Sequence, residues 1–472
     1  MQYFQYIKPN QQHQNCLHPL GDWRLMGMSI VDIEASNSSQ FGHAGLALIG
    51  EMARISGADE ACDNISIAKQ PQIKDKEILR TLFGLLSQGK TDFDQVKEFK
   101  DNSFFQSSLD INKIPSAESL RQRFQGLSLQ TEIDNKLLDC SLNLWSRVGM
   151  QPQHIKYNDR SWVRLDIDAV IYNNSDTKKE GAETTYNYEF GFHPVFAHLG
   201  GGWMVNAMLR PGSAHSLAPG TREFIFQSID LGKSMVQDPV LAVMDSGFDS
   251  QDLIKDLIYT ERTDFIIKHN LRQESKESWL QIAKENCQDM DTTNNKRKTQ
   301  HKYRGSIQRK IPGLESPVRM VFEITEITKR NGQLFISPEI KVFVAWTSLD
   351  LPVKDVLSLY RDRGTSEQYH AEFKGEMDME RLPSGKFKVN NTFLLLGMLV
   401  YNMLRVISQD MVTAKALGLK KATRRRLKTV IRSVIFMCGK ITLHARQLRL
   451  HLGCPRPWFN FFKGLFFSLK AA

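Results

Sequence analysis

Apolar residues recur at two different periods along the chain, and the change of period divides it into regions. From about residue 42 to 144 they recur every three or four positions, with clusters at 46–52, 78–86 and 120–127. This spacing is typical of amphipathic helices. After Trp162 the period falls to about two, as in strands. We therefore expect a helical region over residues 36–150, preceded by a Gln- and Asn-rich leader at 1–35 whose expected state is disorder.

Strand and helix patterns alternate beyond residue 150, which predicts an α/β sheet. Strands are expected at 163–172, 192–199, 203–209, 241–244 and 265–268, with a helix at about 251–259. A β-meander follows at 318–328, 334–336 and 340–346, and its first turn contains Asn331-Gly332. A helical pattern returns from 353 to about 377. The predicted regions are the first part of the core (151–270), a β-rich insertion (271–350), the completion of the core (351–410) and a helical C-terminal region (411–472).

Length and composition are those of a globular protein with several domains, since the 472 residues are 41% hydrophobic and 24% charged. The six cysteines contain no CxxC pair, which excludes a zinc finger, argues against a disulfide framework and favours a reducing compartment. The longest apolar run, 392–407, is interrupted by Asn402 and Arg405. It is too short and too polar for a membrane span, so no membrane partner is expected.

Charge is distributed unevenly along the chain. The net charge is +10, but residues 381–472 carry 18 Lys and Arg against the single acid Asp410, a net +17. Residues 1–380 carry 44 bases and 51 acids, a net −7. A chain polarised in this way is usually basic where it contacts a polyanion, so nucleic acid is the leading partner class and an acidic membrane surface the second.

Three acidic residues stand at positions of the predicted sheet where chemistry could use them. Asp166 and Asp168 lie two apart on the first strand and therefore point to the same face. Asp245 follows the apolar tetrapeptide 241–244, at the carboxyl end of a buried strand, which is where ligands bind in open α/β sheets. A lone aspartate at a strand end is more often a turn former, so the set matters more than any one member.

The helical pattern at 353–377 adds a fourth acid, Glu367, together with Tyr360, Arg363 and Lys374. These residues are separated by 3, 4 and 7 positions, which places them within roughly 60° of one another on a regular helix. The spacing alone slightly favours a solvated face on which Arg363 and Glu367 form an ion pair worth about 0.2–0.5 kcal/mol.

The same four residues match a known signature. Tyr360-(2)-Arg363-(3)-Glu367-(6)-Lys374 is similar to the Y-(2)-R-(3)-E-(6)-K motif of the bacterial cut-and-paste insertion-sequence transposases with a DDE active site, a hairpin-forming group. The resemblance covers about residues 42–452. Further segments resemble one subgroup of this family: 165–168 (LDID), 191–194 (GFHP), 209–212 (LRPG), 245–248 (DSGF), 363–368 (RGTSEQ) and 444–446 (HAR).

This resemblance implies a fold and an active site. The fold class is α/β, with a ribonuclease H-like catalytic core that holds an inserted β-rich subdomain and is flanked by helical N- and C-terminal regions. Asp168, Asp245 and Glu367 would be the catalytic, metal-binding carboxylates. The family usually has Thr or Ser two residues after the first Asp, whereas this chain has Val170. Asp166 therefore remains an alternative first ligand, and Asp168 is preferred.

The implied activity is that of a DNA transposase. It would bind the terminal inverted repeats of its element, cleave them by phosphoryl transfer with two Mg²⁺ ions, for which Mn²⁺ can substitute, and join them to target DNA. Magnesium prefers carboxylate oxygens, so no histidine is required. The alternatives are an inactive transposase-derived DNA-binding protein and a metal-dependent nuclease or resolvase without strand transfer. A homodimer on double-stranded DNA and a cytoplasmic, nucleoid-associated location in a bacterium are expected.

The residues expected to contact DNA lie in two segments. Tyr360, Arg363 and Lys374 would contact phosphates beside the scissile bond, as the resemblance implies. In the basic tail the cations interleave with apolar residues at helical spacing, which predicts amphipathic helices with a cationic face; the residues singled out there are Arg424, Arg425, Arg426 and Lys428. Trp346 is interpreted as a core residue, with stacking on a flipped base as the less favoured role.

Overall fold

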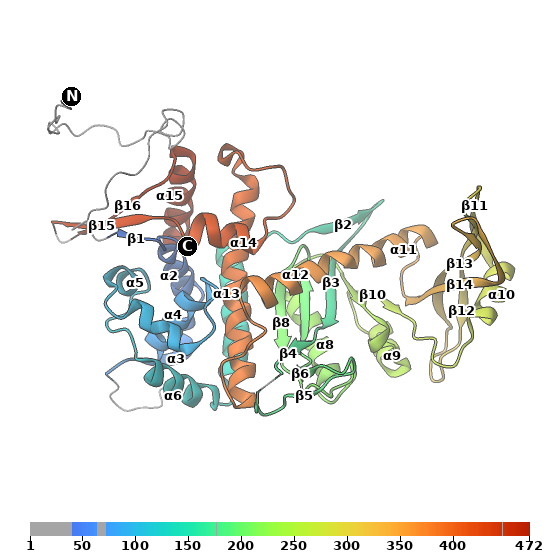
Figure 1. The fold of residues 1–472 in the computed structure, drawn as a ribbon, viewed down its shortest axis with the longest axis horizontal. Coiled ribbons are helices and arrows are strands. Elements are labelled where there is room, and N and C mark those ends of the chain that lie inside the picture. Colours follow the sequence, from blue (N-terminus) through green and yellow to red (C-terminus); the bar gives the residue numbers. More distant parts are fainter. Residues whose placement is uncertain (1–39, 64–71, 176, 446) are drawn as a thin grey trace, which may run out of the picture.

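The computed structural model describes residues 40–63, 72–175, 177–445 and 447–472 (Figure 1). The predicted leader at 1–35 lies outside the described residues. Within them the chain has the mixed α/β fold expected, with one large sheet and many helices. Figure 1 shows the N-terminal helices at one end of the molecule, the central sheet in the middle and the inserted strands at the far end.

The N-terminal region is helical, as the apolar period predicted. Helices α2, α4 and α6 confirm the patterns at 46–52, 78–86 and 120–127. The hydroxyl of Ser116 caps α6 by accepting a hydrogen bond of 3.1 Å from the backbone N–H of Ser119. The helices are α2 (Leu46–Ile55), α3 (Ala58–Asp63), α4 (Asp75–Leu86), α5 (Ser103–Ser108), α6 (Ala117–Ser128) and α7 (Ile133–Val148), with a 3₁₀ helix at Phe93–Phe99.

Five strands form the central part of the sheet in the spatial order β8-β7-β3-β9-β10. They are β3 (Arg160–Ala169), β7 (Val195–Leu199), β8 (Trp203–Met208), β9 (Val240–Met244) and β10 (Thr263–Lys268). The first three pair antiparallel, whereas β9 runs parallel to both β3 and β10. Helix α8 (Thr221–Met235) and helix α9 (Gln251–Ile258) flank β9 in sequence, so parallel pairing is reached through helical crossovers.

The insertion extends the same sheet instead of forming a separate one. Strands β11 (Cys287–Asn294), β12 (Thr299–Arg309), β13 (Val318–Arg330) and β14 (Gln333–Thr347) continue the order from β10, and α10 (Lys276–Glu285) covers one of their faces. The predicted strands at 334–336 and 340–346 are one strand, β14, because both pair with β13. Trp346 is buried and donates a 3.0 Å hydrogen bond to Asp249, which confirms it as a core residue.

The smaller strands lie at the margins of this sheet. Strand β2 (His154–Tyr157) pairs with β3. Strands β4 (Tyr172–Asn173), β5 (Glu183–Thr184) and β6 (Phe190–Phe192) form a separate small sheet in the order β4-β6-β5.

Helix α13 (Phe387–Thr413) stands between the N-terminal helices and the central sheet (Figure 1). It is the one described helix long and apolar enough to cross a membrane, but 94% of its apolar window is buried inside the protein. Asn402 joins it to β8, the edge strand of the sheet, because its side chain bonds both the N–H (3.1 Å) and the C=O (2.8 Å) of Met204. A helix thus covers the sheet edge and satisfies its free backbone groups.

The C-terminal region differs from the run of helices that the sequence predicted. A short helix α14 (Leu427–Val430) and a π turn are followed by the hairpin β15 (Gly439–His444) and β16 (Gln447–Leu452), which pairs with β1 (Gln40–Phe41). In the described part of this region only α15 (Arg456–Ala471) is a long helix, and it packs against α2. The apolar residues Ile441, Leu443, Leu448 and Leu450 alternate with a period of two, which is a strand pattern, so the helical spacing predicted for the tail does not extend to this hairpin.

Candidate active site

Two of the predicted carboxylates meet at the carboxyl ends of adjacent parallel strands. Strands β3 and β9 pair with Ile167 opposite Met244, so Asp168 and Asp245 are the next residues on each strand. Parallel neighbours lie about 4.8 Å apart, which holds the two carboxylates side by side. Burial first, and then the charge of Asp168, raises the pKa of Asp245. The pair is a concentration of negative charge that favours a cation.

The loop after β9 orients the second carboxylate. Asp245 accepts a 2.9 Å hydrogen bond from the N–H of Gly247 and so caps the 3₁₀ turn at Ser246–Phe248. A Cβ atom at position 247 would lie 3.1 Å from Oδ1 of Asp245 and 2.2 Å from Oγ of Ser216. Any larger residue at position 247 would therefore displace Ser216 and crowd the Asp245 carboxylate.

Asp166, the alternative first ligand, already has a cation. Its two carboxylate oxygens each lie 3.0 Å from Nε of Arg164 on the same strand, and both side chains are buried. Burial raises the pKa of Asp166, and the charge of Arg164 acts against that rise. Because Asp166 lies opposite Val243 instead of Asp245, the geometry favours Asp168 as the partner of Asp245.

Arg363 and His370 contact the Asp168 carboxylate. Nη2 of Arg363 lies 2.6 Å from Oδ1, and Nε2 of His370 lies 3.5 Å from Oδ2. Burial alone would raise the pKa of Asp168, but His370 and the Arg363 charge outweigh it, so the pKa is lowered. His370 was not among the predicted residues. It lies three positions after Glu367, and nothing in the local sequence indicates that it would contact Asp168 on β3.

The helix that carries the four-residue signature is not regular. It consists of α11 (Val353–Arg361), a 3₁₀ turn (Asp362–Thr365), α12 (Ser366–Ala371) and a π turn (Glu372–Glu376). A 3₁₀ turn has about 3.0 residues per turn and a π turn has wider i→i+5 bonds, so the angular spacing of a regular α-helix does not apply. The regular-helix prediction that the four side chains share one face therefore does not hold, since Glu367 is exposed whereas Arg363 contacts Asp168.

Each signature residue has a different environment. Tyr360 packs against Phe343 with ring centroids 4.9 Å apart, and burial raises its pKa. Arg363 points to Asp168, whereas Glu367 is exposed. The ammonium of Lys374 donates a 3.0 Å hydrogen bond to the carbonyl of Ile171 and lies 2.9 Å from Glu380.

The fit to a metal ion is therefore partial in this arrangement. Asp168 and Asp245 supply the oxygen donors that Mg²⁺ prefers. Glu367 does not lie with them, and across the described ranges there is no group of three or more His, Cys, Asp or Glu that could hold a metal. The guanidinium of Arg363 instead lies 2.6 Å from Oδ1 of Asp168.

The comparison with known families matches nearly the whole chain. The model described as "Transposase DDE domain group 1" matches residues 31–472. The chain belongs to this transposase family. No curated protein sequence matches the chain. Among solved structures it is similar to the "piggyBac transposase synaptic complex with hairpin DNA", at 11% identity and a TM-score of 0.37, covering 92% of this chain and 82% of that one. The family assignment stands on the first match alone.

In this transposase the basic tail is partly internal. The guanidinium of Arg424 forms an ion pair with Glu372, a residue with no exposed surface, and it lies 4.7 Å from the centre of the Tyr369 ring. Arg424 was predicted to contact DNA, but here its charge compensates a buried acid. The Arg425 guanidinium donates to the carbonyl of Lys420, 2.5 Å away.

The next cations of the tail reach the surface. Arg426 has a side chain 60% exposed that pairs with Glu376 at 2.8 Å, and Lys428 is exposed. The acids Glu372 and Glu376 come from the π turn and bind the whole Arg-rich segment to the helix that carries the signature. Sequence reasoning missed both acids, because nothing local shows that a basic run will fold onto them.

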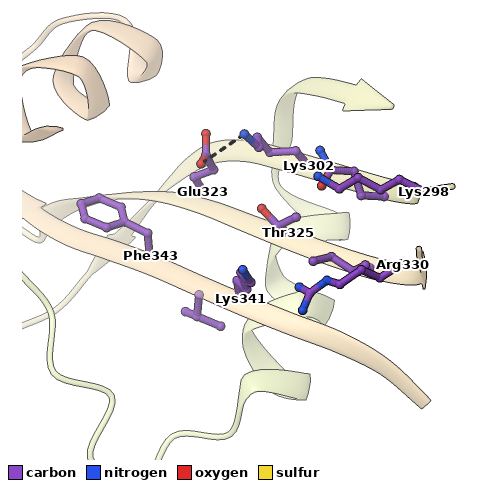
Figure 2. A pocket seen from close by; sticks show the side chains of 10 residues that line it. Lys298, Lys302, Glu323, Thr325, Arg330, Lys341 and Phe343 are labelled. Atoms are coloured by element: carbon purple, nitrogen blue, oxygen red, sulfur yellow. Dashed lines mark ion pairs between the residues drawn. The ribbon is translucent and has the colours of Figure 1, made fainter. Parts of the chain in front are cut away.

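A second basic surface lies on the inserted strands, in a groove of about 370 Å³. Figure 2 shows Lys298, Lys302, Arg330 and Lys341 arranged around Thr325. The groove is lined by Lys298, Gln300, Lys302, Glu323, Thr325, Ile327, Arg330, Lys341, Val342 and Phe343.

The four lining cations of this groove outnumber the two acids that pair with them. Arg330 and Lys341 lie 2.7 and 3.9 Å from Glu339, and Lys302 lies 3.7 Å from Glu323. Glu323, the one acid among the lining residues, lies within 2.7 Å of both Arg304 and Arg361, and burial raises its pKa less than these cations lower it. Phe343 lies at the end of the groove nearest the aspartates, where it contacts Tyr360. The groove thus leads from the signature helix to the outer end of the insertion.

Proposed function

We propose that the protein is a cut-and-paste DNA transposase that binds the ends of a mobile element, cleaves them by metal-assisted phosphoryl transfer and joins them to target DNA. The observation that carries the proposal is the pair Asp168 and Asp245, placed side by side at the ends of two parallel strands. Membership of the DDE transposase family supplies the reaction class. Glu367 is proposed as the third carboxylate.

We also propose that the core is ribonuclease H-like. The order β8-β7-β3-β9-β10, with an antiparallel hairpin followed by two parallel strands, supports this assignment. The first carboxylate then lies on the central strand β3 and the second follows the neighbouring β9. The insertion enters after β10 and returns through β14, immediately before the helix that carries Glu367.

The chain's own residues would hold and orient the DNA. Magnesium held by the carboxylates would stabilise charge on the attacking and leaving oxygens of the phosphodiester. Tyr360 and Lys374 would contact phosphates of the element end beside the scissile bond. Arg426, Lys428 and the basic groove would neutralise further phosphates, which gives affinity independent of sequence. Dimerisation and nucleoid association stay predictions from the sequence.

The reaction itself tests the proposal. With DNA that carries the ends of the element encoding this chain, the purified protein is expected to nick one strand at each end in Mg²⁺ or Mn²⁺ and to leave a 3′-OH. A second, unlabelled DNA should then become joined to that end. Nicks without joined product would indicate a nuclease or resolvase, and binding without nicks would indicate an inactive transposase-derived protein.

The basic groove is tested by the salt dependence of DNA binding. Lys298→Gln combined with Lys341→Gln is expected to lower the slope of log Kd against log salt by about 2, since each phosphate contact contributes about 1. The measurement is a binding titration from 50 to 200 mM salt by fluorescence anisotropy.

The control for the groove removes the same charge from the opposite face. Helix α10 packs on that face, where Trp279 contacts Phe322, so Lys276→Gln with Lys284→Gln is a matched pair. This control should leave the slope unchanged. Equal slopes for the groove variant and the control would remove the groove from the DNA-binding surface.

A further inference from the structure

The guanidinium of Arg363 contacts one member of the aspartate pair, Asp168. Nη2 of Arg363 lies 2.6 Å from Oδ1 of Asp168, and the side chain of Arg363 is only 16% exposed. The contact is an ion pair without an aligned hydrogen bond, since this nitrogen has no hydrogen-bond partner. Burial acts to lower the pKa of Arg363, but Asp168 first, and then Tyr360, Asp245 and Asp166, raise it. Asp168 is the aspartate that the guanidinium contacts directly.

Glu367, the third predicted carboxylate, does not join the aspartate pair. Glu367 is exposed, four positions after Arg363. Arg363 lies within the 3₁₀ turn Asp362–Thr365, and Glu367 is the second residue of α12. A metal site made by Asp168, Asp245 and Glu367 would need the Glu367 carboxylate beside the two aspartates. In the present arrangement Arg363 lies beside Asp168 and Glu367 is exposed.

The segment between them has room to change. A Cβ atom built at Gly364 would meet nothing within 4 Å, so the space beside the backbone is open at this point. A 3₁₀ turn is bonded less well than an α-helix, and in the middle of a helix it often marks a hinge. A change of the turn between 3₁₀ and α geometry rotates every residue after it relative to Arg363.

We propose that Arg363 is a positioning residue that occupies the aspartate pair in the DNA-free chain, and that a DNA phosphate withdraws its guanidinium so that Glu367 can join Asp168 and Asp245. The proposal rests on the function proposed above. Arginine binds phosphate through two parallel N–H···O bonds, whereas its contact with Asp168 is a single ion pair. The phosphate of the element end is thus a competitor of the right chemistry.

This arrangement couples DNA binding to metal binding. A cation and Arg363 compete for the same carboxylate, so the ion should bind weakly until DNA has taken the arginine. The coupling is reciprocal, because a ligand that favours one arrangement raises the affinity of any other ligand that favours it. Free Mg²⁺ would then not assemble the complete site on a chain that has not engaged an element end.

Metal binding to the full-length, DNA-free chain tests the proposal without any activity measurement. Mn²⁺ alone is titrated and free Mn²⁺ is followed by electron paramagnetic resonance. Arg363→Gln and Arg363→Met are expected to bind Mn²⁺ at least ~10-fold more tightly than the wild type, because an opposing charge has been removed from beside the carboxylates. Two variants of similar volume are used so that a folding defect in one leaves the other, and thermal unfolding monitors both.

The controls separate the outcomes. Arg361→Gln removes the same charge two positions away, from a side chain 54% exposed that pairs with Glu323, and should bind Mn²⁺ like the wild type. Adding Asp245→Asn to Arg363→Gln should abolish the gain. Binding by the wild type as tight as by the Arg363 variants would overturn the proposal but leave the metal site intact. Absence of Asp245-dependent Mn²⁺ binding in every variant would overturn both the proposal and the assignment of the site.

Discussion

Asp245→Asn is expected to lower metal-dependent strand cleavage by ~10³-fold or more and yet to leave the chain as stable as the wild type or more stable. The loss follows because an amide is a poor ligand for Mg²⁺, and electrostatic stabilisation worth several kcal/mol is removed from the reaction. The stability follows because Asp245 is buried beside Asp168, and both conditions disfavour its charge. A site built for function is commonly a strained part of the fold.

The stability difference should depend on pH in one direction. Burial and the neighbouring Asp168 raise the pKa of Asp245 in the folded chain, so ionising Asp245 costs the folded state more than the unfolded state. The advantage of the Asn variant should be absent below about pH 4, the unfolded pKa of Asp, and should grow as the pH rises through the higher folded pKa. Urea unfolding in a chelating buffer measures it.

Asp166→Asn is the matched comparison on the first strand. Asp166 is buried and neutralises Arg164, so the substitution leaves a buried cation without its partner and should destabilise the chain. Substitution by Asn is thus expected to destabilise the chain at position 166 and to leave it as stable or more stable at position 245. Cleavage by the Asp245→Asn chain at the wild-type rate would contradict the site described above. A wild-type chain markedly more stable than the Asp245→Asn chain at pH 7 would contradict it as well.

Glu372→Gln is expected to destabilise the chain by about 3–5 kcal/mol, the range for removing one partner of a buried ion pair. Glu372 has no exposed surface, and its carboxylate pairs with Arg424 and accepts the backbone N–H of Leu427 at 3.2 Å. The amide keeps the volume but leaves the Arg424 charge without a partner. Chemical denaturation followed by circular dichroism gives the change in free energy of unfolding.

Glu376→Gln, one turn away, is the control. Its partner Arg426 is 60% exposed and can be solvated by water, and the Gln side-chain oxygen can still accept the backbone N–H of Lys428, so the expected cost is well below that at Glu372. Equal costs at the two positions would mean that Arg424 is not held by a buried acid.

The sequence was sufficient for the site wherever the determinants are local. Alternation along one strand placed Asp168 on the same face as Asp166, and a buried apolar tetrapeptide placed Asp245 at a strand end. Parallel pairing of β3 and β9 then brought Asp168 and Asp245 together. The helical regions and most strands were also predictable, because burial imposes a period of 3.6 or 2 on the sequence.

The remaining features depend on contacts between distant residues. A spacing rule assumes a regular helix, so it could not show that a 3₁₀ turn would send Arg363 to Asp168 and leave Glu367 outside. A charge count treats all cations alike, so it could not distinguish the buried Arg424 from the exposed Arg426. In both cases the partner is far away in the chain, and only the fold brings the two together.

The most direct test of Asp168, Asp245 and Glu367 as the active site is Glu367→Gln, assayed on the element ends in Mg²⁺. Glu367 is exposed, so the substitution should not disturb the fold, and any loss of reaction must come from the chemistry. The variant is expected to bind the element ends with wild-type affinity and to make neither nicks nor joined product. Nicking by the Gln variant at the wild-type rate would contradict the assignment of Asp168, Asp245 and Glu367 as the active site of this transposase.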